Sequence, residues 1–291
     1  MNNKSRVLVM GATGQVGGSV ASLLAREPQL EVVAAARNPA KASHLGVPVV
    51  LLDLDKIETF APALQGIDRL FMATGYTVDM LRQSKDLVNM AKRAGVKQIV
   101  HLGACGDNDT RVAHYGWHQF IERYIEWSAV MFTHLRPEIF MQNLLGYGGE
   151  SYVRQGVIRH YVGDARLSWV DCDDVAAVAV ACLADPQRHA GQTYRLGYEA
   201  KSYHEVAQTF TEVLAQPFSY EPRDPSEFLQ NVLAAGAEPA YMRCVFDSYN
   251  DLTQGKDLGA DQVFENFACI TGGQPRTIAD FARRYADRFR Y

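Results

Sequence analysis

The chain has 291 residues, a net charge of −4 with its histidines neutral, 47% hydrophobic residues and 21% charged residues. This composition is typical of a soluble globular protein of about two domains and excludes a disordered chain. The acidic balance argues against nucleic acid as a partner, because a broad nucleic-acid footprint needs a clearly basic surface. No apolar run is long enough to predict a transmembrane helix or a secretory signal, so no membrane partner is expected. The five scattered cysteines, with no CxxC pair, indicate reduced thiols of a cytoplasmic protein, and no metal-ligand spacing appears.

The first half of the chain alternates short apolar strands with helices. Strands are predicted at residues 6–10, 31–36, 48–52, 69–73 and 98–102. Helices are predicted at 18–26 and 78–94, and Gly95 ends the second of them. Such alternation is typical of a parallel sheet covered by helices on both faces. Because crossovers between parallel strands are right-handed, we predict an α/β fold with a doubly wound parallel sheet.

The second half follows a different pattern. Residues 169–175 resemble a strand end that leads into a helix capped by Asp173 or Asp174 and ending near residue 183. A further helix is predicted at 203–214, a short extended segment at 218–222, and mostly helix over 225–291. We therefore expect one domain over 1–150, with 165–185 adding to its sheet, and a smaller, mainly helical C-terminal lobe over 186–291.

The strongest chemical signal is the turn after the first strand, GATGQVG at residues 11–17. Glycine permits a tight turn, lets a pyrophosphate approach the bare backbone, and allows a helix to pack closely on a strand. The N-terminus of the following helix offers free N–H groups to phosphates. A purely structural glycine turn is the alternative, but its place in a strand–helix–strand unit favours a dinucleotide site. The residues predicted to contact the dinucleotide here are Gly11, Thr13, Gly14, Gln15, Val16 and Gly17.

The end of the second strand indicates which dinucleotide binds. A site specific for NAD usually offers an acidic residue about 20 residues after the glycines, and this chain has Arg37 there. A guanidinium can fork onto a 2′-phosphate, with Lys41 as a second cation. A solvated arginine is the alternative interpretation. We predict that NADP(H) is preferred over NAD(H).

Two further strand ends are expected to line the same crevice, because ligands bind at the carboxyl ends of such strands. Asp53 and Leu54 follow the third strand and are predicted near the adenine, although Asp53 would equally serve as a helix N-cap. Ala73, Thr74 and Gly75 follow the fourth strand and are predicted near the ribose.

Several segments together resemble the NmrA-like group of atypical short-chain dehydrogenases/reductases. They are GATGQVG at 11–17, RNP at 37–39, LRPEIFMQNLL at 135–145 and WVDCDDVA at 169–176, and the resemblance continues to GQPRTIADF at 273–281. The resemblance implies a Rossmann-type domain with a small C-terminal lobe. The group includes NADPH-dependent quinone reductases, triphenylmethane dye reductases and catalytically silent regulators that sense NADP(H).

The chain departs from the wider superfamily at the catalytic positions. That superfamily uses a serine near the fifth strand and a Tyr-x-x-x-Lys motif on the next helix. Here the strand ends without serine, at Cys105, and the tyrosine and lysine positions are His114 and His118, with Tyr115 adjacent. The sequence HQFIE at 118–122 resembles the dye and quinone reductase branch. Because residues four apart share a helix face, we expect Glu122 to orient His118, which would hydrogen-bond the nicotinamide ribose.

The missing tyrosine limits the reaction that the sequence supports. Reduction of a ketone leaves an alkoxide that needs a proton donor, whereas a quinone or a cationic dye delocalises the charge. The chain is therefore predicted to transfer hydride from NADPH to a small quinone-like or other conjugated substrate, with His118, His114 and Tyr115 as catalytic candidates. One alternative is a non-catalytic NADP(H) sensor with a protein partner, and another is a dehydrogenase, reductase or isomerase for a different substrate. His114 is either an acid or a packing residue.

The substrate side is predicted from aromatic and polar residues near the expected nicotinamide. Aromatic side chains suit a flat acceptor, and packing between the two lobes is the alternative role for each. Phe140 is expected against the cofactor. The remaining candidates are Tyr76, Asn143, Tyr147 and Trp169.

Overall fold

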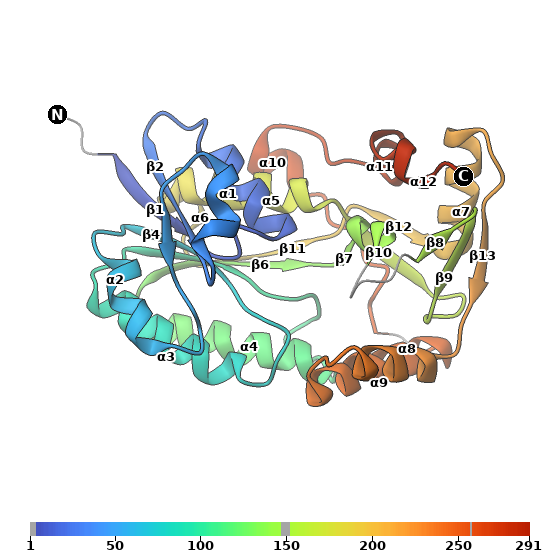
Figure 1. The fold of residues 1–291 in the computed structure, drawn as a ribbon, viewed down its shortest axis with the longest axis horizontal. Helices are drawn as coiled ribbons and strands as arrows, with labels where there is room; N and C mark the ends of the chain where they lie inside the picture. Colours follow the sequence, from blue (N-terminus) through green and yellow to red (C-terminus); the bar gives the residue numbers. More distant parts are fainter. Residues whose placement is uncertain (1–3, 147–151, 257) are drawn as a thin grey trace.

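A seven-stranded parallel sheet forms the centre of the computed structural model, which describes residues 4–146, 152–256 and 258–291 (Figure 1). The strand order is β11-β6-β5-β4-β1-β2-β3, so the chain starts in the middle and the order reverses between β1 and β4. In open parallel sheets a ligand binds beyond the carboxyl ends of the strands at such a reversal. The strands are β1 (Ser5–Val9), β2 (Leu30–Ala36), β3 (Val49–Leu51), β4 (Arg69–Ala73), β5 (Gln98–Leu102), β6 (Met131–Pro137) and β11 (Gln192–Leu196).

Helices cover both faces of this sheet, because its central strands are apolar on both sides (Figure 1). One face carries α1 (Gln15–Leu24), α5 (Cys172–Ala184) and α10 (Phe267–Thr271). The other carries α2 (Phe60–Leu64), α3 (Met80–Arg93) and α4 (Ala113–Trp127). The predicted α/β fold with a doubly wound sheet is therefore confirmed.

The rest of the chain forms a lobe with a core of its own around Trp169, Phe210 and Phe281. The lobe holds two small sheets, in the orders β12-β10-β7 and β13-β9-β8, so it is mixed rather than mainly helical. In Figure 1, α8 and α9 lie near the end of α4, and α4 contacts α9. The lobe strands are β7 (Ile139–Phe140), β8 (Val153–Arg154), β9 (Val157–His160), β10 (Arg166–Val170), β12 (Glu199–Ser202) and β13 (Ser219–Pro222). Its helices are α7 (Tyr203–Leu214), α8 (Pro225–Ala234), α9 (Pro239–Thr253), α11 (Ile278–Arg284) and α12 (Ala286–Phe289), while the short α6 (Pro186–His189) leads into β11.

The structure corrects two predictions for residues 165–185. Strand β10 pairs with β12 and β7, and the seventh strand of the main sheet is β11 instead. The N-cap of α5 is Asp171, whose Oδ1 accepts a hydrogen bond from the Asp173 amide at 2.7 Å. Asp173 and Asp174 instead form ion pairs with Arg284 and Arg276. The predicted domain boundary at residue 150 lies outside the described residues.

The bounds of the first helices differ slightly from the predicted ones. α1 begins at Gln15 rather than Gly18, because the glycine turn itself leads into the helix with Gly14 as N-cap. α3 spans most of the predicted range, and Gly95 beyond its end has a φ of +83°, a value that favours glycine. None of the helices in the described ranges is long and apolar enough to span a membrane.

Candidate functional site

A cleft of about 1330 Å³, including its open mouth, lies beyond the carboxyl ends of β1 to β4. This is the edge where the strand order reverses. The fold brings together at this edge residues that the sequence places at four separate strand ends. Those predicted for the cofactor that line the cleft are Gly11, Thr13, Gly14, Arg37, Asp53, Leu54, Ala73, Thr74 and Gly75.

The glycine turn at one end of the cleft fits a phosphate group. Gly11 has a φ of +63°, which side chains rarely adopt. A Cβ on Gly17 would overlap the carbonyl oxygen of Gly11 and lie 2.6 Å from that of Met10, so α1 packs directly on the turn. The N-terminus of α1 has no side-chain cap and no acidic residue in its first turn. Its first N–H groups and its positive dipole end therefore remain available to an anion.

Several residues predicted for the cofactor are not among those that line the cleft. Val16 is a buried residue of α1, and Gln15 accepts a hydrogen bond from the Cys172 thiol at 3.5 Å. Lys41 is exposed on the 3₁₀ helix η1 (Pro39–Leu45).

Arg37, which lines the cleft, is exposed, and among the described residues nothing forms an ion pair or a hydrogen bond with its guanidinium. Arg37 is therefore free to meet a ligand.

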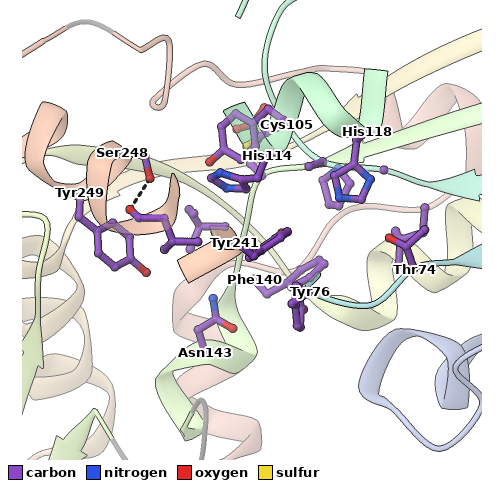
Figure 2. A pocket seen from close by; sticks show the side chains of 18 of the residues that line it. Thr74, Tyr76, Cys105, His114, His118, Phe140, Asn143, Tyr241, Ser248 and Tyr249 are labelled. Atoms are coloured by element: carbon purple, nitrogen blue, oxygen red, sulfur yellow. Dashed lines mark hydrogen bonds between the residues drawn. The ribbon is translucent and has the colours of Figure 1, made fainter. Parts of the chain in front are cut away.

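A second cavity, of about 1070 Å³ with its opening, continues from the cleft, and Thr74 and Tyr76 line both. We call it the acceptor cavity, after the hydride acceptor that the sequence predicts. Figure 2 shows His118, Thr74, Tyr76 and Phe140 on one side of it and Ser248 and Tyr249 on the other. The sequence candidates that line it are Thr74, Tyr76, His114, Tyr115, His118, Phe140 and Asn143.

The lobe closes the acceptor cavity with residues that sequence reasoning missed. The Tyr241 ring of α9 lies 5.5 Å from that of Tyr76 and 5.2 Å from that of His114, as centroid distances. No local pattern marks these positions, because they approach the sheet only in the folded molecule. The lobe residues that line the cavity are Tyr152, His160, Tyr241, Val245, Ser248 and Tyr249.

Trp169 does not reach the acceptor cavity, contrary to its assignment as a substrate residue. Its side chain is fully buried in the lobe core, where Nε1 donates a hydrogen bond to the Lys201 carbonyl at 2.9 Å. Its ring meets that of Tyr203 edge-on. The aromatic residue at a strand end is therefore a packing residue here. Tyr147 lies outside the described residues.

Burial keeps the cavity histidines neutral. Desolvation lowers the pKa of His114 to about 4 and holds that of His118 well below its usual value. Glu122 does not orient His118 as predicted, because its two oxygens accept hydrogen bonds from Arg136 at 2.9 and 2.5 Å. The His118 ring instead faces that of buried His101, with centroids 5.9 Å apart.

A cluster of titratable groups lies behind His118. His101, Glu122 and His134 are fully buried and place potential ligand atoms within 4.8 Å of one another. Desolvation lowers the pKa of His101 to about 3 and that of His134 to about 2, so both imidazoles are neutral. The guanidinium of Arg136, which pairs with the Glu122 carboxylate, would repel a metal cation bound at this point. The cluster is therefore better described as a polar core beneath the cavity.

Glu138 is a further cavity residue without a role in the sequence prediction. It follows β6 directly, within the LRPEIF segment, and its side chain is only 3% exposed. Desolvation raises its pKa to about 7, against the opposing effect of the neighbouring Arg195. The rule that ligands meet the carboxyl ends of parallel strands would have singled it out from the sequence.

Comparison with known proteins gives a consistent family. A family model described as the NmrA-like family matches residues 3–281. The NAD(P)H azoreductase of Xenophilus azovorans is 32% identical over 97% of this chain and 99% of its own length. Quinone oxidoreductase 2 of Escherichia coli is 26% identical over 88% of each chain. The structure of the Citrobacter sp. triphenylmethane reductase with NADP(H) superposes with a TM-score of 0.80 at 24% identity, over 96% of this chain and 99% of that one.

Proposed function

We propose that this chain, which belongs to the NmrA-like family, is an NADPH-dependent oxidoreductase that transfers hydride to a quinone-like or other conjugated acceptor. The observation that supports this proposal most is that the cleft and the acceptor cavity are continuous. A cleft that begins at a phosphate-compatible glycine turn opens, past Thr74 and Tyr76, into a cavity lined by aromatic side chains. A dinucleotide laid along the cleft would present its reactive end to that cavity.

The cofactor side of the proposal assigns a role to each end of the cleft. The glycine turn and the first N–H groups of α1 would hold the pyrophosphate, and the free guanidinium of Arg37 would pair with a 2′-phosphate. Thr74 and His118 would lie at the nicotinamide end, where His118 is predicted to position the ribose. Bound NADPH supplies the hydride, and the residues of this chain bind it, orient it and exclude water.

The substrate side rests on the shape and chemistry of the acceptor cavity. The rings of Tyr76, Tyr115, Phe140 and Tyr241 surround it, and such rings favour a flat conjugated molecule. The names of the relatives refer to azo compounds, a quinone and a triphenylmethane dye, all of which accept hydride into a delocalised system. We therefore propose this class of acceptor.

The test is NADPH oxidation by the purified protein with a panel of quinones, azo dyes and triphenylmethane dyes. We expect acceptor-dependent oxidation with at least one class, and slower turnover in His118→Ala. NADPH binding is measured in parallel by calorimetry. The proposal is contradicted if NADPH binds but none of the acceptors oxidises it. Tight binding without oxidation by any acceptor would instead support a non-catalytic NADP(H) sensor.

A further inference from the structure

We propose that the carboxyl group of Glu138 is the acid that protonates the acceptor when it takes up hydride. This inference rests on the proposed function and adds to it the proton donor that the missing tyrosine leaves unassigned. Glu138 lines the acceptor cavity and also a deeper recess of about 600 Å³ that opens from it. Among the described residues that line the acceptor cavity, no other bears a carboxyl group.

The end of β11 fixes Glu138 through three successive residues. Arg195 donates to Oε1 from Nε at 3.1 Å and from Nη2 at 2.7 Å. The Leu196 carbonyl accepts a hydrogen bond from the Glu138 amide at 2.9 Å. A Cβ on Gly197 would lie 2.6 Å from Cγ of Glu138, so this position leaves room for the glutamate side chain. The backbone, the side-chain stem and the carboxylate of Glu138 are therefore each held in place. A general acid requires such positioning.

The surroundings of Glu138 allow it to carry a proton near neutral pH. Both hydrogen bonds from Arg195 end on Oε1, so a proton on the second oxygen is compatible with them. The titratable and charged groups that face Glu138 come from the main sheet, the loop after β5 and the start of α4: Arg195, Asp107, Cys105 and Tyr115. Desolvation outweighs the attraction of Arg195 and raises the pKa of Glu138 to about 7. The neutral imidazoles of His114 and His118 hold no such acidic proton.

The proposed step differs between acceptors in its proton balance. A quinone that takes up hydride becomes a hydroquinone anion with both electrons already gained. The proton leaves the Glu138 carboxyl for the new oxyanion, which yields neutral hydroquinone and a carboxylate that Arg195 stabilises, and water then restores the proton. A cationic triphenylmethane dye becomes neutral on accepting the same hydride and needs no proton. Glu138 should therefore matter for quinones and not for such dyes.

The experiment compares Glu138→Gln with wild type, using one quinone and one cationic dye. We expect kcat/KM for the quinone to fall about 100-fold, the lower end of the range for general acid catalysis, while dye reduction changes little. In wild type, quinone turnover should decline as the pH rises above about 7, because the acid loses its proton, and this decline should be absent in the variant. Asp107→Asn is the matched control, since Asp107 pairs with the same Arg195 but lies outside the lining of both cavities. It should keep quinone turnover and the decline at high pH, with the decline moved to lower pH because the charge of Asp107 raises the pKa of Glu138.

A second readout needs no turnover. Folding raises the pKa of Glu138 from 4.5 to about 7, so between these two values the unfolded chain gives up this proton while the folded protein keeps it, and the free energy of unfolding falls as the pH rises. Wild type should therefore lose thermal stability relative to Glu138→Gln from about pH 4.5 to 7. The proposal is contradicted if the variant loses quinone and dye turnover equally, if it keeps the wild-type pH profile, or if the stability difference is independent of pH. A wild type that reduces no acceptor would overturn the proposed function, and the assignment of Glu138 with it. If wild type is active and Glu138→Gln keeps its quinone turnover, only the assignment of Glu138 is overturned.

Discussion

At the scale of a single residue, we propose that Arg37 sets the preference for NADPH. It stands at the end of β2, lines the cleft and is exposed, in the place where an acidic residue would hold a ribose hydroxyl. A hydrogen bond to a charged group contributes about 1.5–3 kcal/mol, and about 1.4 kcal/mol corresponds to a tenfold change in affinity. We therefore expect Arg37→Ala to weaken NADPH binding about 10- to 100-fold and to leave NADH binding nearly unchanged, as measured by calorimetry.

Lys41 provides the matched comparison for Arg37. It is a second cation within the same segment, but it lies on η1 outside the residues that line the cleft. Lys41→Ala should therefore have the smaller effect on NADPH affinity. An unchanged ratio of NADPH to NADH affinity in Arg37→Ala would reject Arg37 as the discriminating residue.

Residues within a local motif could be placed in the fold from the sequence. The glycine turn and Arg37 follow from their spacing along the chain, and the structure places both at one cleft. Trp169 and Glu122 were misassigned, because their partners, the Lys201 carbonyl and Arg136, come from distant segments. The place of Glu138 at a strand end was visible in the sequence, but its burial and its pairing with Arg195, 57 residues away, appear only in the folded molecule.

At the scale of an element, the position of α1 depends on Gly17. A Cβ there would meet backbone atoms of Met10 and Gly11, which cannot move aside as a flexible side chain would. Gly17→Ala should therefore shift α1, destabilise the protein by about 1–3 kcal/mol, as overpacking does, and weaken NADPH binding at the displaced N-terminus. Denaturant unfolding and calorimetry measure the two effects.

Gly116 is the control for this substitution, because it lies within α4 and a Cβ added to it would meet no atom within 4 Å. Gly116→Ala should leave stability unchanged or raise it by up to about 1 kcal/mol, the difference in helix propensity. Equal losses in the two variants would show that the close contact between α1 and the turn is not the cause.

Strands and helices were predictable from the sequence where they alternate regularly along the chain. Strands that are short and pair with distant segments were not. The runs at β4, β5 and α7 match their predicted ranges, because each is a continuous apolar or amphipathic pattern. The short strands of the lobe were missed, since β7 and β8 have only two residues each. The seventh strand, β11, carries Thr193 and Arg195 at the edge of the sheet and lacks a continuous apolar run.

At the scale of the whole molecule, the C-terminal segment ties the lobe to α5 and so to the helix beside the glycine turn. Asp173 accepts a hydrogen bond from Ser19 of α1 at 2.6 Å and pairs with Arg284 of α11. Asp174 is fully buried and binds both the backbone amide of Arg276, at 2.7 Å, and its guanidinium. Asp173 and Asp174 thus join the side of the molecule that holds the glycine turn to its C-terminal segment.

Arg276→Ala tests this connection, because it leaves the Asp174 carboxylate buried without its guanidinium. Loss of a partner from a buried pair costs about 3–5 kcal/mol, and we expect about 2 kcal/mol at pH 8, since the Arg276 side chain is 40% exposed and solvent screens the pair. Desolvation already raises the pKa of Asp174 to about 6, and removal of the cation raises it further. The variant should therefore be less destabilised at pH 5, where Asp174 takes up a proton.

Arg283 offers the comparison that separates this ion pair from a general loss of charge in the same segment. It pairs with Asp280 at 2.8 Å, and both side chains are at least half exposed, so Arg283→Ala should change the free energy of unfolding by at most about 0.5 kcal/mol at either pH. Denaturant unfolding at pH 5 and pH 8 measures all three proteins. A pH-independent loss in Arg276→Ala would attribute its effect to packing of the arginine stem. A loss that grows with pH would instead show that the buried carboxylate depends on the C-terminal segment, and that the lobe contributes to the stability of the cofactor side.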